Sequence, residues 1–182
     1  LSFVDAQGVF RGSNLDPDGS RSNNVNLMQR DHIRVHLRPE STSLKPMSNG
    51  LFISAPLVGK VSGVRTIQLT RKIVDTQGRT LGVVVASLNQ RHLIDVFRGV
   101  DFGTQGGVAL VGLDGILRAR VIGGNAKDTD QPLPEEMLTA IRTQPAGALQ
   151  SHSTDDLERI VGFARVGDYD LAVVGGTSSE QA

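Results

Sequence analysis

The sequence predicts an α/β fold of the α+β type, in which antiparallel β-sheets are flanked by short helices. One observation is a strand-turn-strand pattern at the start of the chain that begins again after residue 100. A second is internal similarity, because residues 3–12 (FVDAQGVFRG) align with residues 110–119 (LVGLDGILRA). The Val-rich segments at residues 81–87 and 171–177 also resemble each other. Ordered similarity of this kind is typical of a repeated structural module.

We therefore expect two tandem modules, at residues 1–100 and at residues 101–182. The second module is smaller and lacks a counterpart of the basic segment at residues 25–36 (VNLMQRDHIRVH). Chance similarity between β-hairpins is the alternative explanation.

The first half begins with an expected hairpin at residues 1–10, where a Gly-containing turn separates two apolar runs. Residues 27–37 (LMQRDHIRVHL) predict a short helix, since Leu27, Ile33 and Leu37 fall near one face. Further strands are expected at residues 51–56, 64–73 and 81–88, followed by a helix at residues 90–100.

The second half repeats this order. Residues 108–120 predict a strand, a turn and a strand, and residues 132–142 a helix with Pro134 in its first turn. Three last strands are expected at residues 148–153, 157–166 and 171–178, with turns at TDD (154–156) and GDYD (167–170).

Composition excludes several classes of function. The 182 residues include 19 basic and 19 acidic side chains, no cysteine and only 4% aromatics. A neutral chain with few aromatics argues against nucleic-acid binding. Thiolate metal sites and disulfides are impossible without cysteine. No apolar run approaches the ~20 residues that cross a bilayer, and no G-x-S-x-G or H-E-x-x-H motif indicates a hydrolase.

Positive character is concentrated at Arg30, His32, Arg34 and His36. His32 and His36 have the i, i+4 spacing of a zinc site, but HIRVH lacks the Glu of H-E-x-x-H and its arginine would repel a dication. Arginine binds carboxylates in a bidentate manner, and a neighbouring imidazole supplies a directional hydrogen bond. The residues alone leave two readings open: a small-anion site, or a solvated helix face whose charges pair locally.

Several segments in this order resemble the double Cache (PDC, PAS-like) sensor domains. They are LSFVDAQG, QRDHIRVHL, LFISAPLVGKVSGVRTIQLTRKI, GRTLGVVVASL, GVALVGLDGILRAR and DDLERIVGFARVGDYDLAVVGGTS. Such domains lie on the extracytoplasmic side of bacterial diguanylate cyclases, histidine kinases and chemoreceptors. The resemblance implies two PAS-like modules, with residues 1–100 membrane-distal and the remainder membrane-proximal.

The resemblance also implies features outside the sequence. The family has an N-terminal stalk helix, which is absent here because the chain starts at the first strand without a Met. TSSEQA (177–182) would lead into a membrane span. The parent protein would then be membrane-anchored, periplasmic and a possible homodimer.

The family often carries D-R-x-Y-F where this chain has Gln29-Arg30-Asp31-His32-Ile33. The arginine that commonly binds a ligand carboxylate is retained as Arg30. An aspartate that serves the amino-acid-binding members aligns with Ser87. Without it, an α-ammonium group lacks an anionic partner, so the departures favour a plain organic acid.

Strand alternation adds candidates, since Phe52 and Ser54 share one face of their strand and Arg71 matches a recurring family arginine. The expected ligand-binding residues are Arg30, His32, His36, Phe52, Ser54, Arg71 and Ser87. No cofactor, metal or catalytic residue is expected.

The expected function is an extracytoplasmic sensor domain that binds a small organic carboxylate and relays a conformational signal to a cytoplasmic output domain. A ligand-free structural or dimerisation spacer is the alternative, and a hydrolytic enzyme is a remote one. If a protonated His32 contacts the anion, affinity should fall as the pH rises from roughly 5.5 to 8.

Overall fold

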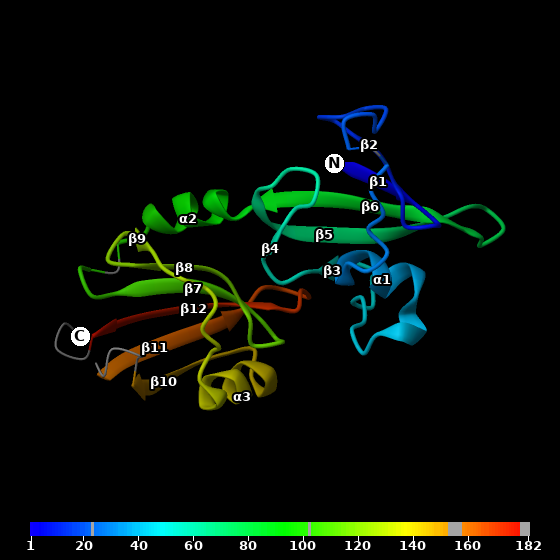
Figure 1. Ribbon diagram of the computed structural model, residues 1–182. Helices are drawn as coiled ribbons and strands as arrows, with labels where there is room; N and C mark the ends of the chain where they lie inside the picture. The colour runs from blue at the N-terminus through cyan, green and yellow to red at the C-terminus, as the bar shows by residue number, and fades with distance from the viewer. Residues whose placement is uncertain (23, 102, 153–157, 179–182) are drawn as a thin grey trace. The chain divides into compact units, whose positions relative to one another are not determined.

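The computed structural model describes residues 1–22, 24–101, 103–152 and 158–178 (Figure 1). The chain divides into two compact units, Leu1–Asn89 and Gln90–Ala182. Each unit contains one antiparallel six-stranded sheet, and three α-helices occur in the described residues. The architecture is therefore α+β. No helix in this part of the chain has the length and apolar character that a membrane span requires.

The sheet of the first unit has the strand order β2-β1-β6-β5-β3, and β4 also pairs with β5. Every pair is antiparallel. The strands are β1 (Ser2–Asp5), β2 (Phe10–Ser13), β3 (Phe52–Ile53), β4 (Leu57–Val58), β5 (Arg65–Val74) and β6 (Thr80–Asn89).

Helix α1 (Asp31–Leu37) packs against this sheet, with contacts to β3, β5 and β6. A 3-10 turn, η1 (Pro39–Ser41), follows it. The helix begins later than the expected residue 27, because Arg30 is extended, with φ −80° and ψ 131°, and caps the helix. The apolar part of the interface consists of Val4, Phe10, Leu27, Ile33, Val83 and Val85.

The turn between β1 and β2 requires glycine at position 8. Gly8 has φ +79°, which costs an L-residue about 1–2 kcal/mol. A Cβ atom there would also lie 2.8 Å from Cβ of Met28. The Asp5 carboxylate closes the same turn by accepting hydrogen bonds from the amides of Gln7 and Val9 and from Nε of Arg11.

The second unit begins with α2 (Gln90–Arg98), which contacts β8. Its sheet has the order β10-β11-β12-β7-β8-β9. The remaining elements are β7 (Gly107–Gly112), β8 (Leu117–Ile122), β9 (Asn125–Ala126), α3 (Glu135–Thr143), β10 (Ala146–His152), β11 (Glu158–Arg165) and β12 (Leu171–Ser178).

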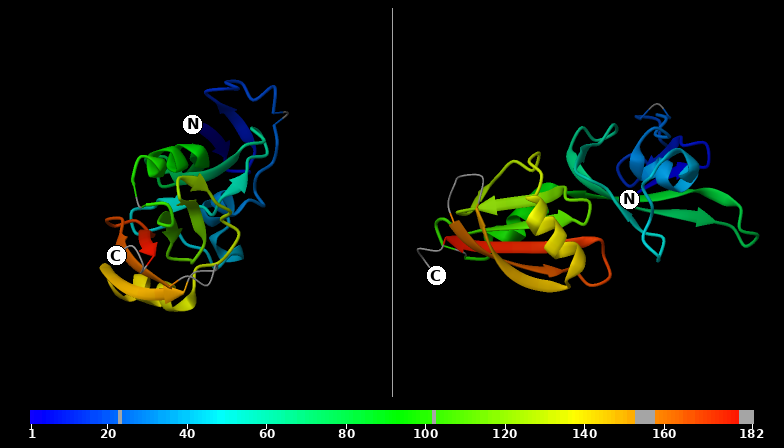
Figure 2. Two further views of the ribbon diagram at one scale, coloured as in Figure 1. Left: turned by 90° about the vertical axis from the view of Figure 1, so that its left-hand side faces the viewer. Right: turned by 90° about the horizontal axis from the view of Figure 1, so that it is seen from below.

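Helix α3 lies across the second sheet, as the right-hand view of Figure 2 shows. Glu135 and Glu136 occupy its first turn, where the helix dipole favours negative charge. Met137 and Ile141 of α3 join an apolar core with Val111, Leu117 and Phe163.

The two sheets share one connection pattern. In each, a hairpin comes first, and its first strand pairs with the last strand of the unit: β1 with β6, and β7 with β12. That last strand pairs in turn with the strand before it. Gly115, aligned with Gly8, also has a positive φ of +84°.

Some short elements were not expected from the sequence, namely η1, β4 and β9. Helix α2 lies in the second unit, although the sequence placed residues 90–100 in the first module. The TDD turn (154–156) and the last residues of TSSEQA (179–182) lie outside the described residues.

Candidate functional site

The candidate site of the first unit is built around the two histidines of α1. His32 and His36 are one helical turn apart, so they lie on the same side of the helix. Their exposed fractions are only 5% and 6%. Nε2 of His36 lies 2.9 Å from Oγ1 of Thr70 on β5, which directs this side of the helix toward the sheet.

His32 is buried without full hydrogen bonding. Its Nδ1 has no hydrogen-bond partner among the described residues. Burial is the main cause that lowers the pKa of His32 to about 4, and the charges of Arg30 and His36 lower it further, while Asp31 raises it. The imidazole is therefore neutral at pH 7 in the free protein.

This pKa changes the expected pH dependence. A decline in affinity between pH 5.5 and 8 would require His32 to lose its proton in that interval. Because a pKa near 4 lies below it, we expect His32 to contact a ligand as a neutral imidazole, with one donor and one acceptor nitrogen.

His36 is held rather than free. Burial lowers the pKa of His36, a hydrogen bond with the backbone of Thr70 raises it, and the charge of Lys72 lowers it. Because its Nε2 is engaged by Thr70, His36 fixes α1 on β5.

Arg30 is half-buried at the start of α1, and among the described residues its guanidinium makes no ion pair. The adjacent acid is engaged elsewhere, since Asp31 pairs with Arg34 at 2.5 Å. Arg30 therefore does not pair with its neighbour Asp31 on the helix surface. Its guanidinium can donate two parallel hydrogen bonds to a ligand carboxylate.

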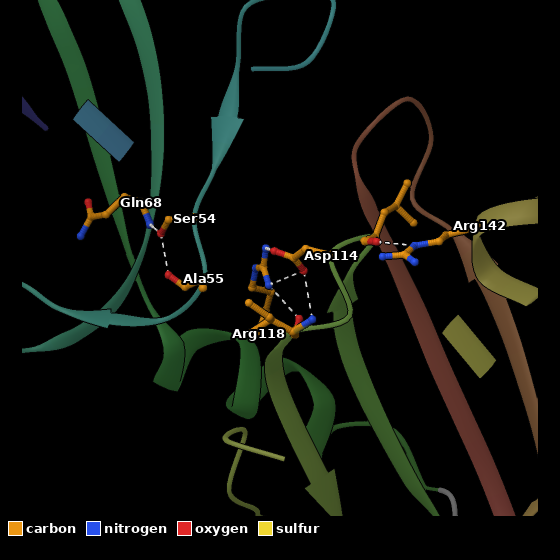
Figure 3. A network of polar contacts seen from close by, with 8 residues as sticks. Ser54, Ala55, Gln68, Asp114, Arg118 and Arg142 are labelled. Atoms are coloured by element: carbon orange, nitrogen blue, oxygen red, sulfur yellow. Dashed lines mark hydrogen bonds and ion pairs between the residues drawn. The ribbon is translucent and has the colours of Figure 1, made fainter. Parts of the chain in front are cut away.

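A ladder of polar side chains covers β5 beside the histidines. Thr66, Gln68 and Thr70 alternate along the strand and are each at most 5% exposed. The Gln68 amide donates from Nε2 to Oγ1 of Thr66 at 2.7 Å and accepts at Oε1 from Oγ of Ser87 at 2.7 Å. Figure 3 shows Ser54, which accepts from the backbone amide of Gln68 and donates to the carbonyl of Ala55.

The strand register places most expected residues on the face that α1 covers. Thr70 pairs with Phe52 and Val85, and Gln68 pairs with Ser87. Directly opposed residues share a face, and Val85 belongs to the core with Ile33 of α1. Phe52 is half-buried and Ser87 is exposed.

Arg71 does not join this group. It follows Thr70 on β5, so its side chain lies on the opposite face of the sheet, and it is exposed. Arg65, Ile67 and Leu69 share that opposite face with Arg71, because alternate residues of a strand point to the same side. The structure shows that the residues between them, Thr66, Gln68 and Thr70, face α1.

The second unit has a polar cluster of another kind. Arg118 is 3% exposed and pairs with Asp114 at 2.8 Å across the β7–β8 turn (Figure 3). Nε of Arg142 on α3 donates to the carbonyl of Leu113 in the same turn at 2.8 Å. These contacts brace the turn.

Metal binding gains no support from the described part of the chain, where no group of three His, Cys, Asp or Glu side chains could hold an ion. The Nε2 atom of His36 is also occupied by its hydrogen bond with Thr70, so this atom does not serve as a second metal ligand beside His32.

No protein-family model and no curated protein matches the chain. Solved structures do match its fold. A domain described as the extracellular domain of a histidine kinase, rpHK1S-Z16, has a TM-score of 0.80 at 21% identity, covering 99% of this chain and 70% of that chain.

The ligand-binding domain of the Pseudomonas fluorescens chemoreceptor CtaA, in complex with L-leucine, has a TM-score of 0.60 at 17% identity, covering 99% of this chain and 70% of that chain. The ligand-binding domain of Mlp24 with asparagine has a TM-score of 0.59 at 12% identity, covering 99% and 68%. These likenesses confirm, at the level of the fold, the resemblance to extracellular ligand-binding domains of histidine kinases and chemoreceptors.

Proposed function

We propose that this chain is the extracytoplasmic sensor domain of a membrane-bound bacterial signalling protein, and that its first unit binds a small organic carboxylate. The observation that carries the proposal is that, among the described residues, the half-buried Arg30 makes no ion pair and the buried imidazole of His32 has an unbonded nitrogen. Buried polar groups without partners are rare in folded proteins. A bound ligand would supply both partners.

The residues have distinct roles in this proposal. Arg30 binds the carboxylate through two parallel N–H donors. His32 supplies a directional hydrogen bond, and His36 holds the helix on β5 through Thr70. Ser54 already uses its hydroxyl proton for Ala55, so it shapes the polar face rather than donating to the ligand. Arg71 lies outside the site.

The fold supports the sensing role, because its structural neighbours include the extracellular domain of a histidine kinase and the ligand-binding domains of CtaA and Mlp24. The CtaA and Mlp24 ligands are amino acids, which share a carboxylate with the ligand class proposed here. Binding would shift the unit between two conformations by its differential affinity for them. The parent's cytoplasmic domain, a kinase or a diguanylate cyclase, would read out the change.

We infer a spacer role for the second unit. Where α1 covers hydroxyl and amide side chains, α3 covers an apolar core that includes Val111, Met137 and Phe163. An apolar interface packs tightly but offers no directional partner to a polar ligand. The unit therefore suits transmission of a displacement.

The test is a thermal-shift screen against carboxylates, amino acids and divalent metals. A ligand at about a hundred times its Kd stabilises by roughly 2.7 kcal/mol, which corresponds to about 5–10 °C here. We expect a carboxylate shift that Arg30→Ala abolishes. Arg38→Ala, an exposed arginine at the other end of α1, is the matched control and should retain it. A shift that survives Arg30→Ala, or one seen only with metals, contradicts the proposal.

A further inference from the structure

The described helices, strands and turns that contact α1 offer no buried carboxylate that could receive an ammonium group. The strands and the turn that pack against α1 are β3, β5, β6 and η1. Glu40 of η1 is their only acidic residue, and it is exposed. The acid of α1 itself, Asp31, is exposed and pairs with Arg34.

Of the charged side chains that act on the two histidines, Arg30 and Lys72 are positive, and the negative Asp31 is already paired with Arg34. The charge of Arg30 acts on His32, and that of Lys72 acts on His36. A ligand that brings a cation next to its carboxylate would meet repulsion without a compensating partner. An α-amino acid is therefore a poor match for this site.

The unbonded Nδ1 of His32 requires a partner of a particular kind. A neutral imidazole nitrogen is either a donor or an acceptor, depending on the tautomer. A hydroxyl group can serve as either, whereas a hydrogen or methyl substituent would leave the buried nitrogen without a bond. A ligand with a hydroxyl beside its carboxylate satisfies Arg30 and His32 together, since the two residues lie close enough for the charge of Arg30 to act on the imidazole.

We propose that the site of the first unit selects 2-hydroxycarboxylates over the corresponding amino acids and unsubstituted acids, and that His32 determines this preference. The inference rests on the proposed carboxylate-binding function. In this proposal Arg30 binds the carboxylate of the ligand. His32 distinguishes a hydroxyl from an amino group or a hydrogen on the carbon next to that carboxylate.

Titration calorimetry with two matched series tests this assignment. Lactate, propionate and L-alanine share a three-carbon skeleton, and malate, succinate and L-aspartate share a four-carbon one. We expect the hydroxy acid of the series that fits the site to bind about tenfold more tightly than the unsubstituted acid, the effect of one added hydrogen bond. The amino acid should bind more weakly than both.

Two variants of His32 distinguish a loss of the hydroxyl preference from a loss of the folded structure. In His32→Asn the side-chain amide group stands close to the place of Nδ1, so the hydroxyl preference should be retained. In His32→Gln the amide group extends toward the place of Nε2, so the preference should fall to about twofold or less while the unsubstituted acid binds as before. Circular dichroism and Tm establish that both variants are folded.

The outcomes distinguish this inference from the proposed function. Carboxylate binding that depends on Arg30 but shows no hydroxyl preference, or a preference unchanged in His32→Gln, overturns only the role of His32. Tighter binding of the amino acid overturns the assigned ligand class. If no member of either series binds, the carboxylate function fails together with this inference.

Discussion

At the scale of single residues, His32 shows how burial and charge together set the chemistry of the first unit. Its Nδ1 is buried without a hydrogen-bond partner among the described residues, and the charge of the half-buried Arg30 acts on the ring. Leaving a buried polar group unbonded costs about 1–3 kcal/mol. A ligand that forms a hydrogen bond with this nitrogen would remove the cost.

The lowered pKa of His32 predicts acid destabilisation. The unfolded state takes up the proton near pH 6.5 and the folded state only near pH 4. Stability is therefore complete above pH 6.5 and is lost as the pH falls between these values. Between pH 7 and pH 5 we expect a loss of about 2 kcal/mol from His32, measured by urea unfolding at each pH.

A His32→Leu variant should lose this part of the pH dependence, because it carries no titrating group there. His92 is exposed on α2, so His92→Gln is the matched control and should follow the wild type. Equal pH dependence in wild type and His32→Leu would show that His32 is not buried as a neutral group.

Burial on both faces of β5 limits what the sequence can predict about single residues of the candidate site. Arg30 and His32 were predicted from the basic segment and from the resemblance; they lie at the start of α1, and their role in binding a ligand stays a prediction. Thr66, Gln68 and Thr70 were missed because β5 is buried on both faces: Ile67, on the other face, is only 2% exposed. Alternation cannot then tell which face α1 covers.

At the scale of elements, the bond between His36 and Thr70 fixes α1 on β5. Thr70→Val removes the hydroxyl and leaves the buried Nε2 of His36 unbonded, which should cost about 1–3 kcal/mol of stability. Thr76→Val, in the exposed turn after β5, is the control and should stay within about 0.5 kcal/mol of wild type. Equal effects in urea unfolding would contradict the role of this bond.

Two glycines give a matched test of the turns. Gly8 and Gly78 have nearly equal φ values of +79° and +80°, but a Cβ at Gly78 meets nothing within 4 Å. Gly78→Ala should therefore cost about 1–2 kcal/mol from backbone strain alone. Gly8→Ala should cost roughly a further 1–3 kcal/mol, because Met28 must move. Equal Tm losses would show that the contact with Met28 relaxes freely.

The element boundaries show what periodicity can predict. The long strands β5 and β6 and the helix α3 carry strong patterns, and all were expected. The two-residue strands β4 and β9 depend on pairing with distant residues, so no local signal marks them. The start of α1 depends on the extended backbone of Arg30, which an uninterrupted apolar pattern from Leu27 does not reveal.

At the scale of the whole molecule, the antiparallel α+β architecture could be predicted from strand patterns, while the contents of each helix–sheet interface could not. The aligned hairpins at residues 3–12 and 110–119 occupy corresponding places in the two sheets. The interfaces differ: α1 covers hydroxyls and an amide beside its apolar core, whereas α3 packs Met137 and Ile141 against Phe and Val side chains. That difference separates the proposed sensing unit from the proposed spacer.

The pairing of the first strand with the last in each unit has a consequence for biosynthesis. Ser2 on β1 pairs with Val85 on β6, and Val108 on β7 pairs with Gly175 on β12. Neither sheet can be completed until almost all of its unit has left the ribosome. Contacts between residues so distant in sequence slow folding, so each unit should acquire its structure late and in one cooperative step.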